Sequence, residues 1–293
     1  MNVVKITAGI GNQMFQYAFY MALRAQNHDT AIDISDFMYR RNRFATKLSD
    51  IFTITPNIIT PDQLHDFVDA SSSLAARFRR SVLGIHRNVP GSVFRQQNFD
   101  FDESVFSRFN TYFIGLWQSW KYFAAVDADV RAQFNYITPL NRINQVVAEA
   151  MQQSESVAIH IRRGDISRRS QFAEIGSVCT YDYYNWAIAS IRQQLGDEGV
   201  HFFVFADDTK WAHSTLQLSN VTYIDWNKGP ESYLDIRLMS LCKHNIIANN
   251  ADSWWAAYTN TNPDKIVIAP QRWFRSTPTP DIYPQGWNTI PID

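Results

Sequence analysis

The amino-acid sequence predicts an α/β protein whose parallel sheets are connected by helices. Short apolar strand patterns alternate with longer helical patterns along most of the chain, as they do in repeated βαβ units. Small and polar residues follow several of these strands, and parallel sheets bind ligands at that edge. The chain has 293 residues, of which 45% are hydrophobic, so it can form two domains with buried cores.

The N-terminal half begins with a strand, a helix and a second strand. Residues 40–100 follow without a clear period, and a further strand and helix come after them. The predicted elements are strands at residues 3–7, 30–35 and 111–120 and helices at 14–26 and 121–134.

The C-terminal half alternates more regularly. Its predicted strands are residues 156–161, 201–208, 221–226, 245–250 and 265–270, and its helices are 143–153, 181–195, 232–244 and 253–260. The two halves join near Pro139. We therefore predict domains at residues 1–140 and 141–275, followed by a C-terminal tail at 276–293.

Composition excludes several classes of function. The net charge of -1 and the pI near 6.7 give no global field that would attract nucleic acid. Two cysteines, Cys179 and Cys242, are too few for a disulfide framework and fit a reducing compartment. The N-terminus does not resemble a signal peptide, and no stretch approaches the roughly 18 apolar residues of a membrane span. We expect a soluble, cytoplasmic protein.

The stretch SVAIHIRRGDI, residues 156–166, runs an apolar strand into a group of charges. Arg162 and Arg163 follow the strand directly, with His160 before them and Asp165 after them. Arginine suits a diphosphate because its planar fork donates two hydrogen bonds and keeps its charge. A surface ion pair and a merely packed histidine are the alternatives.

Three aspartates lie beside apolar residues in the C-terminal half, namely Asp207, Asp208 and Asp235. A carboxylate in such surroundings needs a partner, and the N1–H and amino group of guanine would provide one. The alternative is helix capping by Asp208 and a first-turn position for Asp235, and for the Asp207–Asp208 pair we favour capping. Farther on, Ser253 begins a predicted helix whose free N–H groups would form an anion site.

Two other patterns have weaker interpretations. GIGNQM, with Asp33 about 20 residues farther on, partly matches a dinucleotide fingerprint. Met14 replaces the third glycine, so we favour a tight turn in which Asn12 caps the helix. The DAD sequence at residues 127–129 matches a metal-binding pattern, but it lies in a helical stretch where its two carboxylates would not share a face. We predict no metal and no other cofactor.

Three sequence blocks follow one another along the chain. They are GIGNQMFQYAF near the start, HIRRGD in the middle, and LMSLCKHNIIANNADSWWAAY with KIVIAPQRWF toward the end. Together they resemble glycosyltransferase family 11, the α-1,2-fucosyltransferases. The resemblance implies a GT-B fold, in which two Rossmann-like domains face each other across a cleft, with residues 1–140 on the acceptor side and residues 141–275 binding the donor. It implies inverting, metal-independent transfer of L-fucose from GDP-β-L-fucose to the 2-hydroxyl of a terminal β-galactoside.

The resemblance also implies roles for the residues named above. Arg162 would stabilise the leaving diphosphate, assisted by Arg163. His160 and Asp235 would hold guanine or its ribose. The predicted donor pocket is completed by Asp207, Asp208 and Ser253, and Asn12 would contact phosphate or acceptor.

The general base is open among several groups. Asp165 is the first candidate because it follows the arginines, Glu174 is the second and Asp33 the third. A phosphate oxygen of the donor is the alternative.

Other functions stay open at the level of sequence. They are a different linkage made by a fucosyltransferase with the same HxRR motif, an NAD-dependent oxidoreductase that uses GIGNQM, and a non-catalytic glycan-binding protein. Arg77, Arg79, Arg80 and Arg87 lie beside apolar residues, which raises the hypothesis of peripheral contact with the inner membrane face, where an acceptor could be lipid-linked. A solvated amphipathic helix is the favoured alternative.

Overall fold

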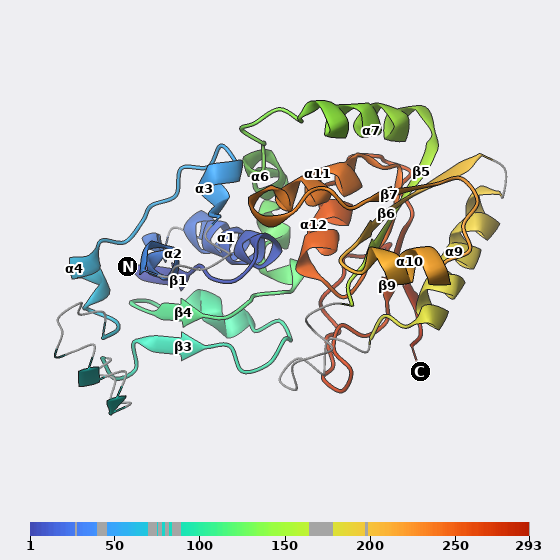
Figure 1. Cartoon of the computed structure of the whole chain (residues 1–293). Coiled ribbons are helices and arrows are strands. Elements are labelled where there is room, and N and C mark those ends of the chain that lie inside the picture. The colour runs from blue at the N-terminus through green and yellow to red at the C-terminus, as the bar shows by residue number, and fades with distance from the viewer. Residues whose placement is uncertain are drawn as a thin grey trace. The chain divides into compact units, whose positions relative to one another are not determined.

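The chain forms two compact units, Met1–Ile137 and Thr138–Asp293 (Figure 1). The computed structural model describes residues 1–26, 28–39, 46–69, 75, 78–79, 82–83, 89–163, 178–196 and 199–292. At the junction, two successive residues each form a hydrogen bond within their own unit. Ile137 N–H donates to the carbonyl oxygen of Ile51 at 2.8 Å, and Arg237 donates to the carbonyl oxygen of Thr138 at 2.7 Å.

Unit 1 contains a four-stranded parallel sheet in the order β2-β1-β4-β3. Its strands are β1 (Asn2–Lys5), β2 (Thr30–Asp33), β3 (Val93–Arg95) and β4 (Tyr112–Ile114). Helix α1 (Ile10–Ala25) connects β1 to β2 and is buried on most of its surface. The Phe19 ring stacks on Trp117 with ring centroids 4.2 Å apart. This apolar packing explains why the segment is hydrophobic almost all round.

The remaining elements of unit 1 are short. They are α2 (Ser35–Tyr39), α3 (Leu48–Ile51), α4 (Pro61–Leu64), the 3-10 turns η1 (Glu103–Ser107), η2 (Trp120–Tyr122) and η3 (Ala124–Val126), and α6 (Asp127–Gln133). The single helix predicted at 121–134 is therefore wrong in its first half, where Ser119 caps a 3-10 turn through Lys121 N–H.

Unit 2 contains a six-stranded sheet in the order β10-β9-β8-β5-β6-β7, and every pairing in it is parallel. Its strands are β5 (Glu155–Ile161), β6 (Val200–Ala206), β7 (Val221–Ile224), β8 (His244–Ile246), β9 (Val267–Pro270) and β10 (Asn288–Ile290). The segment after residue 275, for which the sequence predicted a tail, thus contributes β10 to the edge of the sheet.

Helices cover both faces of this sheet (Figure 1). One layer consists of α7 (Arg142–Gln153), α11 (Tyr233–Leu241) and α12 (Ala251–Thr259), and the other of α9 (Tyr181–Leu195) and α10 (Thr209–Thr215), with the turn η5 (Gly229–Glu231) before α11. Val157, Ile159 and Ile161 of β5 belong to the core formed with α9. Because side chains alternate along a strand, His160 points to the opposite face.

The predicted α/β fold class is confirmed, since each unit is a parallel sheet with helical connections. The start of α1 was predicted wrongly. The chain turns at Ala8, which has a positive φ of 68°, and the extended Gly9 is the N-cap. The helix therefore begins at Ile10, and Asn12 lies inside it rather than capping it.

Candidate active site

The ends of β5 and β6 bring the predicted arginine pair and Asp207 together. Ile161 pairs with Ala206 in register, so the residues that follow the two strands are neighbours at the carboxyl edge. Asp207 accepts a hydrogen bond from the backbone N–H of Arg163 at 2.8 Å. Its second oxygen lies 3.6 Å from Nε of Arg162. One carboxylate thus holds the main chain of one arginine and attracts the side chain of the other.

The two guanidinium groups have different surroundings. The Arg163 group lies over the Trp211 ring of α10, 4.0 Å from its centroid, where a cation–π interaction holds it in place. The Arg162 side chain is 37% exposed, although its Nε atom is buried. The two arginines thus differ in their partners, which are an aromatic ring for Arg163 and the Asp207 carboxylate for Arg162.

His160 is neutral at physiological pH. Burial and the positive charge of Arg162 together lower the pKa of its imidazole to about 4, against the opposing effect of Asp207. Its Nδ1 atom is buried and has no hydrogen-bond partner in the described part of the chain. A buried polar atom without a partner is costly, so this nitrogen is a ready contact for a polar group of a ligand.

Asp208 caps α10, as the capping alternative predicted. Its Oδ1 accepts the N–H of Trp211 at 3.1 Å. The cap fixes the residue on which Arg163 stacks, so Asp208 supports the arginine pair indirectly.

Asp235 lies in the first turn of α11 and joins a buried amide network that the sequence analysis missed. It accepts a hydrogen bond from Nδ2 of Asn227 at 2.8 Å. Asn227 exchanges side-chain hydrogen bonds of 2.8 and 3.1 Å with Asn144 of α7, and Trp226 donates to the same Asn144 at 2.9 Å. The polar DWN run directly after β7 was the signal available in the sequence.

Burial and the nearby Asp252 raise the pKa of the Asp235 carboxyl to about 7, against the lowering effect of the hydrogen bond from Asn227. Perturbed carboxyls of this kind are enriched in functional sites. Protonation of Asp235 can therefore change near neutral pH.

Ser253 does not occupy the helix start predicted for it. Asn250 is the N-cap of α12, and its Oδ1 accepts the N–H of Asp252 at 2.8 Å. Ser253 is fully buried, and its hydroxyl lies within hydrogen-bond distance of the carbonyl oxygens of Ala248 and Asn250. The asparagine run shifted the helix start by two residues, because asparagine is at least as good a cap as serine.

Asn12 lies in unit 1, where its Oδ1 accepts a 2.7 Å hydrogen bond from Gln118. The neighbouring Gln16 is buried and bridges two strand ends. It accepts from Thr7 N–H at 2.8 Å and donates to the carbonyl oxygen of Gly115 at 3.0 Å. The polar residues of the GNQMFQ block therefore hold the loops after β1 and β4 together.

Asp33 is buried at the end of β2, and three hydrogen bonds occupy its carboxylate. They come from the Tyr112 hydroxyl at 2.5 Å and from the N–H and hydroxyl of Ser35 at 2.8 and 3.2 Å. This saturation makes Asp33 a poor ribose ligand and a poor base.

Several sequence predictions fall on other parts of the chain. Asp165 and Glu174 lie outside the described residues, as do Arg77, Arg80 and Arg87 of the membrane-surface hypothesis. The DAD sequence lies in α6, as predicted, and Asp127 pairs with Arg131 one turn later. Among the described residues, no helix combines the length and the apolar character needed to span a bilayer.

Known proteins match this sequence over nearly its whole length. The chain is similar to the O-antigen biosynthesis glycosyltransferase WbnK of Escherichia coli, with 28% identity over 96% of this chain and 98% of WbnK. An Escherichia coli alpha-1,2-colitosyltransferase is also 28% identical, over 93% and 92% of the two chains. The galactoside 2-alpha-L-fucosyltransferase Sec1 of Mus musculus is 22% identical over 92% and 67%.

A solved structure shares the fold. The NodZ alpha-1,6-fucosyltransferase, soaked with GDP-fucose, superposes with a TM-score of 0.51 at 12% identity, over 88% of this chain and 91% of that one. This likeness, together with the two parallel sheets, confirms the predicted GT-B class. The sequence model of Glycosyl transferase family 11 matches residues 87–291, which is most of the chain. The protein therefore belongs to glycosyltransferase family 11.

Proposed function

We propose that the protein transfers L-fucose from GDP-β-L-fucose to the 2-hydroxyl of a terminal β-galactoside, with inversion to an α-1,2 linkage and without a metal ion. Membership of the family supports glycosyl transfer. The names of two relatives support the linkage, since one is an alpha-1,2-colitosyltransferase and one a galactoside 2-alpha-L-fucosyltransferase. The observation that carries the proposal is the accessible Arg162 side chain at the end of β5, beside Asp207.

The reaction needs positive charge where the leaving group forms. The acceptor oxygen attacks C1 of the sugar, the bond from C1 to the diphosphate oxygen breaks, and its electron pair stays on GDP. Arg162 donates to the diphosphate as this charge develops, which is the stage at which a positioned donor lowers the barrier. Asp207 keeps the guanidinium in orientation, and the stacked Arg163 adds positive charge nearby.

The nucleoside would be held by two titratable groups whose pKa values are shifted by burial, His160 and Asp235. The neutral His160 offers its unpartnered Nδ1 to guanine or ribose. Asp235, when ionised, would accept the N1–H and amino group of guanine. Asn227 would hold the aspartate in place through its 2.8 Å hydrogen bond. Asp208 and Ser253 support this pocket from within their own turns, and Asn12 of unit 1 remains the proposed contact to phosphate or acceptor.

The acceptor hydroxyl must lose its proton during transfer. We keep Asp165 as the first candidate base and Glu174 as the second. The three hydrogen bonds of Asp33 weigh against the third candidate. A phosphate oxygen of the donor is the alternative that requires no carboxylate.

The test is release of GDP from GDP-fucose by the purified protein, with and without β-galactosides. Acceptor-dependent release, followed by identification of the new linkage by NMR, is the expected result. A linkage to another hydroxyl would replace the α-1,2 assignment while keeping the enzyme class. Binding of NADH in preference to GDP would favour an oxidoreductase, and glycan binding without any nucleotide dependence would favour a non-catalytic role.

Colitosyl transfer is the second candidate, and the 28% identity to the colitosyltransferase favours it. Colitose lacks the 3-hydroxyl of fucose, so a site that hydrogen-bonds this hydroxyl would discriminate strongly between the two donors. Parallel assays with GDP-fucose and GDP-colitose decide the donor by the ratio of their kcat/KM values.

Use of a cytoplasmic donor such as GDP-fucose also supports the proposed cytoplasmic localisation, and a lipid-linked acceptor would bring the protein to the inner membrane face.

A further inference from the structure

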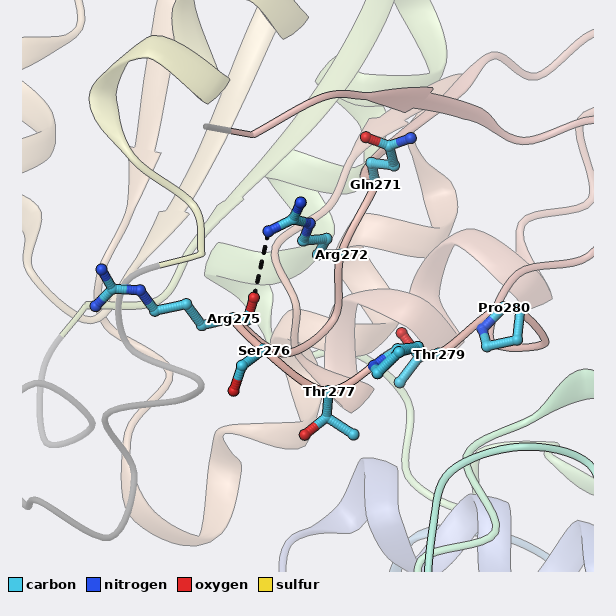
Figure 2. A pocket seen from close by; sticks show the side chains of 8 residues that line it. Gln271, Arg272, Arg275, Ser276, Thr277, Thr279 and Pro280 are labelled. Carbon is cyan, nitrogen blue, oxygen red and sulfur yellow. Dashed lines mark hydrogen bonds between the residues drawn. The ribbon is translucent and has the colours of Figure 1, made fainter.

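A basic pocket lies in the loop after β9, at the carboxyl edge of the unit 2 sheet. It has a volume of about 480 Å³, which is within the usual range for small-molecule sites. Figure 2 shows how the loop curves around it between Gln271 and Pro280. The lining residues are Gln271, Arg272, Arg275, Ser276, Thr277, Pro278, Thr279 and Pro280.

The lining has the chemistry of an anion site. It contains two arginines, one amide and three hydroxyl side chains, and it contains no carboxylate. Arg272 and Arg275 are exposed, and neither forms an ion pair with another residue in the described part of the chain. Two like charges that share a pocket repel each other, and a bound anion would remove that cost.

The loop is held in place by hydrogen bonds to the sheet. Asn249, at the end of the adjacent β8, donates to the Trp273 carbonyl oxygen at 3.0 Å. Gln271 N–H donates to Ile290 of β10 at 2.8 Å, and the Tyr283 hydroxyl donates to Pro270 at 2.7 Å. Arg272 donates to the Arg275 carbonyl oxygen at 3.4 Å (Figure 2). A pocket on an anchored loop loses less entropy on binding than one that must first be ordered.

The position of the pocket separates it from Arg162. Strand β9 lies two places from β5 in the sheet, which corresponds to about 10 Å at the usual strand spacing. We propose that this pocket binds a phosphate or diphosphate group carried by a substrate. The group belongs either to the GDP donor or to a phosphate-bearing acceptor, and the assignment to one of these rests on the proposed function.

The experiment measures binding of inorganic pyrophosphate and of GDP by calorimetry to the full chain. The variants are the pair Arg272→Gln with Arg275→Gln, the same pair combined with Arg162→Gln, and Arg142→Gln as a control. Arg142 is an exposed residue of α7 and lies outside the pocket lining. Each charged hydrogen bond lost should weaken binding roughly tenfold or more, so we expect the pair to weaken pyrophosphate binding by at least this factor and the control to leave it unchanged.

The two sources of the phosphate give different results. If GDP affinity falls along with that of pyrophosphate, the pocket holds the donor. If GDP affinity stays constant in the pocket variants while their KM rises only for a phosphate-bearing acceptor, the pocket holds the acceptor. Unchanged pyrophosphate binding in the pocket variants, or an equal loss in Arg142→Gln, would overturn the proposal. The binding arm requires no turnover, so its failure is distinct from a failure of GDP-fucose to serve as donor.

Discussion

Asp207 Oδ2 lies 3.6 Å from Nε of Arg162, across the ends of two parallel strands. The other oxygen of the same carboxylate accepts the Arg163 N–H, so the aspartate has a fixed orientation. For the role proposed for Arg162, this geometry would order an arginine whose side chain is 37% exposed. A flexible surface arginine would lose more entropy on binding the diphosphate.

Arg162→Lys should abolish most of the turnover while leaving the fold intact. Lysine keeps the charge but cannot donate two parallel hydrogen bonds to the diphosphate. Loss of a positioned donor costs about 3–4 kcal/mol of transition-state stabilisation, a hundredfold to thousandfold in rate. The measurements are kcat and Tm, with Arg142→Lys as the control. Turnover close to that of the parent protein would assign stabilisation of the leaving diphosphate to Arg163 instead of Arg162.

Asp207→Asn tests the bracing role. The amide oxygen can still accept the Arg163 N–H, but the attraction for Arg162 is lost. A small displacement of the guanidinium should lower kcat roughly tenfold to a hundredfold. Asp208→Asn is the matched control, because asparagine caps α10 as well as aspartate does. Equal losses in both variants would show that the effect comes from the loop as a whole.

Asp235→Asn should change the pH dependence of stability. The carboxyl has a pKa of about 7 in the folded protein and near 4 in an unfolded chain. The stability that its neutral form contributes is therefore complete below about pH 4 and is lost as the pH rises to about 7. Asparagine stays neutral, so Tm should exceed that of the parent by at least about 2 °C at pH 8 and match it near pH 4.

The exposed Asp225→Asn controls for charge in the same measurement. If ionised Asp235 binds guanine, GDP affinity in the parent protein should rise between pH 6 and pH 8, within about one unit of its pKa. The same affinity should stay flat with pH in Asp235→Asn. A flat profile in the parent would separate Asp235 from the nucleoside.

Turnover should continue in excess EDTA. Asp127 of the DAD sequence pairs with Arg131 at 3.0 Å, and the charge on the leaving group is assigned to arginine. Loss of activity on chelation that manganese or magnesium restores would contradict the metal-free mechanism. A buffer of the same ionic strength without EDTA serves as the control.

Gly115→Ala should destabilise unit 1. A Cβ at this position would lie 2.7 Å from Gln96 Oε1 and 2.9 Å from the Trp117 ring. Overpacking of this kind costs about 1–3 kcal/mol, measured by urea unfolding. Gly9→Ala is the matched control, because its Cβ would meet nothing within 4 Å. A smaller loss at Gly115 than at Gly9 would contradict the packing argument.

The sequence predicted unit 2 better than unit 1, because the signals in unit 2 are local in sequence. Helix α9 runs over Tyr181–Leu195 as predicted, since Thr180 caps its start and Gly196, with a φ of 84°, ends it. In unit 1, β3 was missed because three residues at the sheet edge carry too little pattern. Its position depends on pairing with β4, which lies well over ten residues away in sequence.

At the candidate site, too, local signals were recognised from the sequence and contacts between distant residues were not. Arg162 and Asp207 were both predicted at the site because they lie at the ends of strands that had been recognised, but their pairing was not predicted. The amide network from Asn144 to Asp235 was not, because its members are 83 and 8 residues apart and only packing of α7 against α11 brings them together. Ser253 was misplaced because the preceding asparagines compete for the same cap.

The bonds made by Ile137 and Thr138 mark where the chain passes from unit 1 to unit 2. The N–H of the first is fixed to Ile51 of unit 1, and the carbonyl oxygen of the second to Arg237 of α11. The chain thus enters unit 2 by bonding to the helix whose first turn carries Asp235. A displacement of the backbone at Thr138 would therefore act directly on α11.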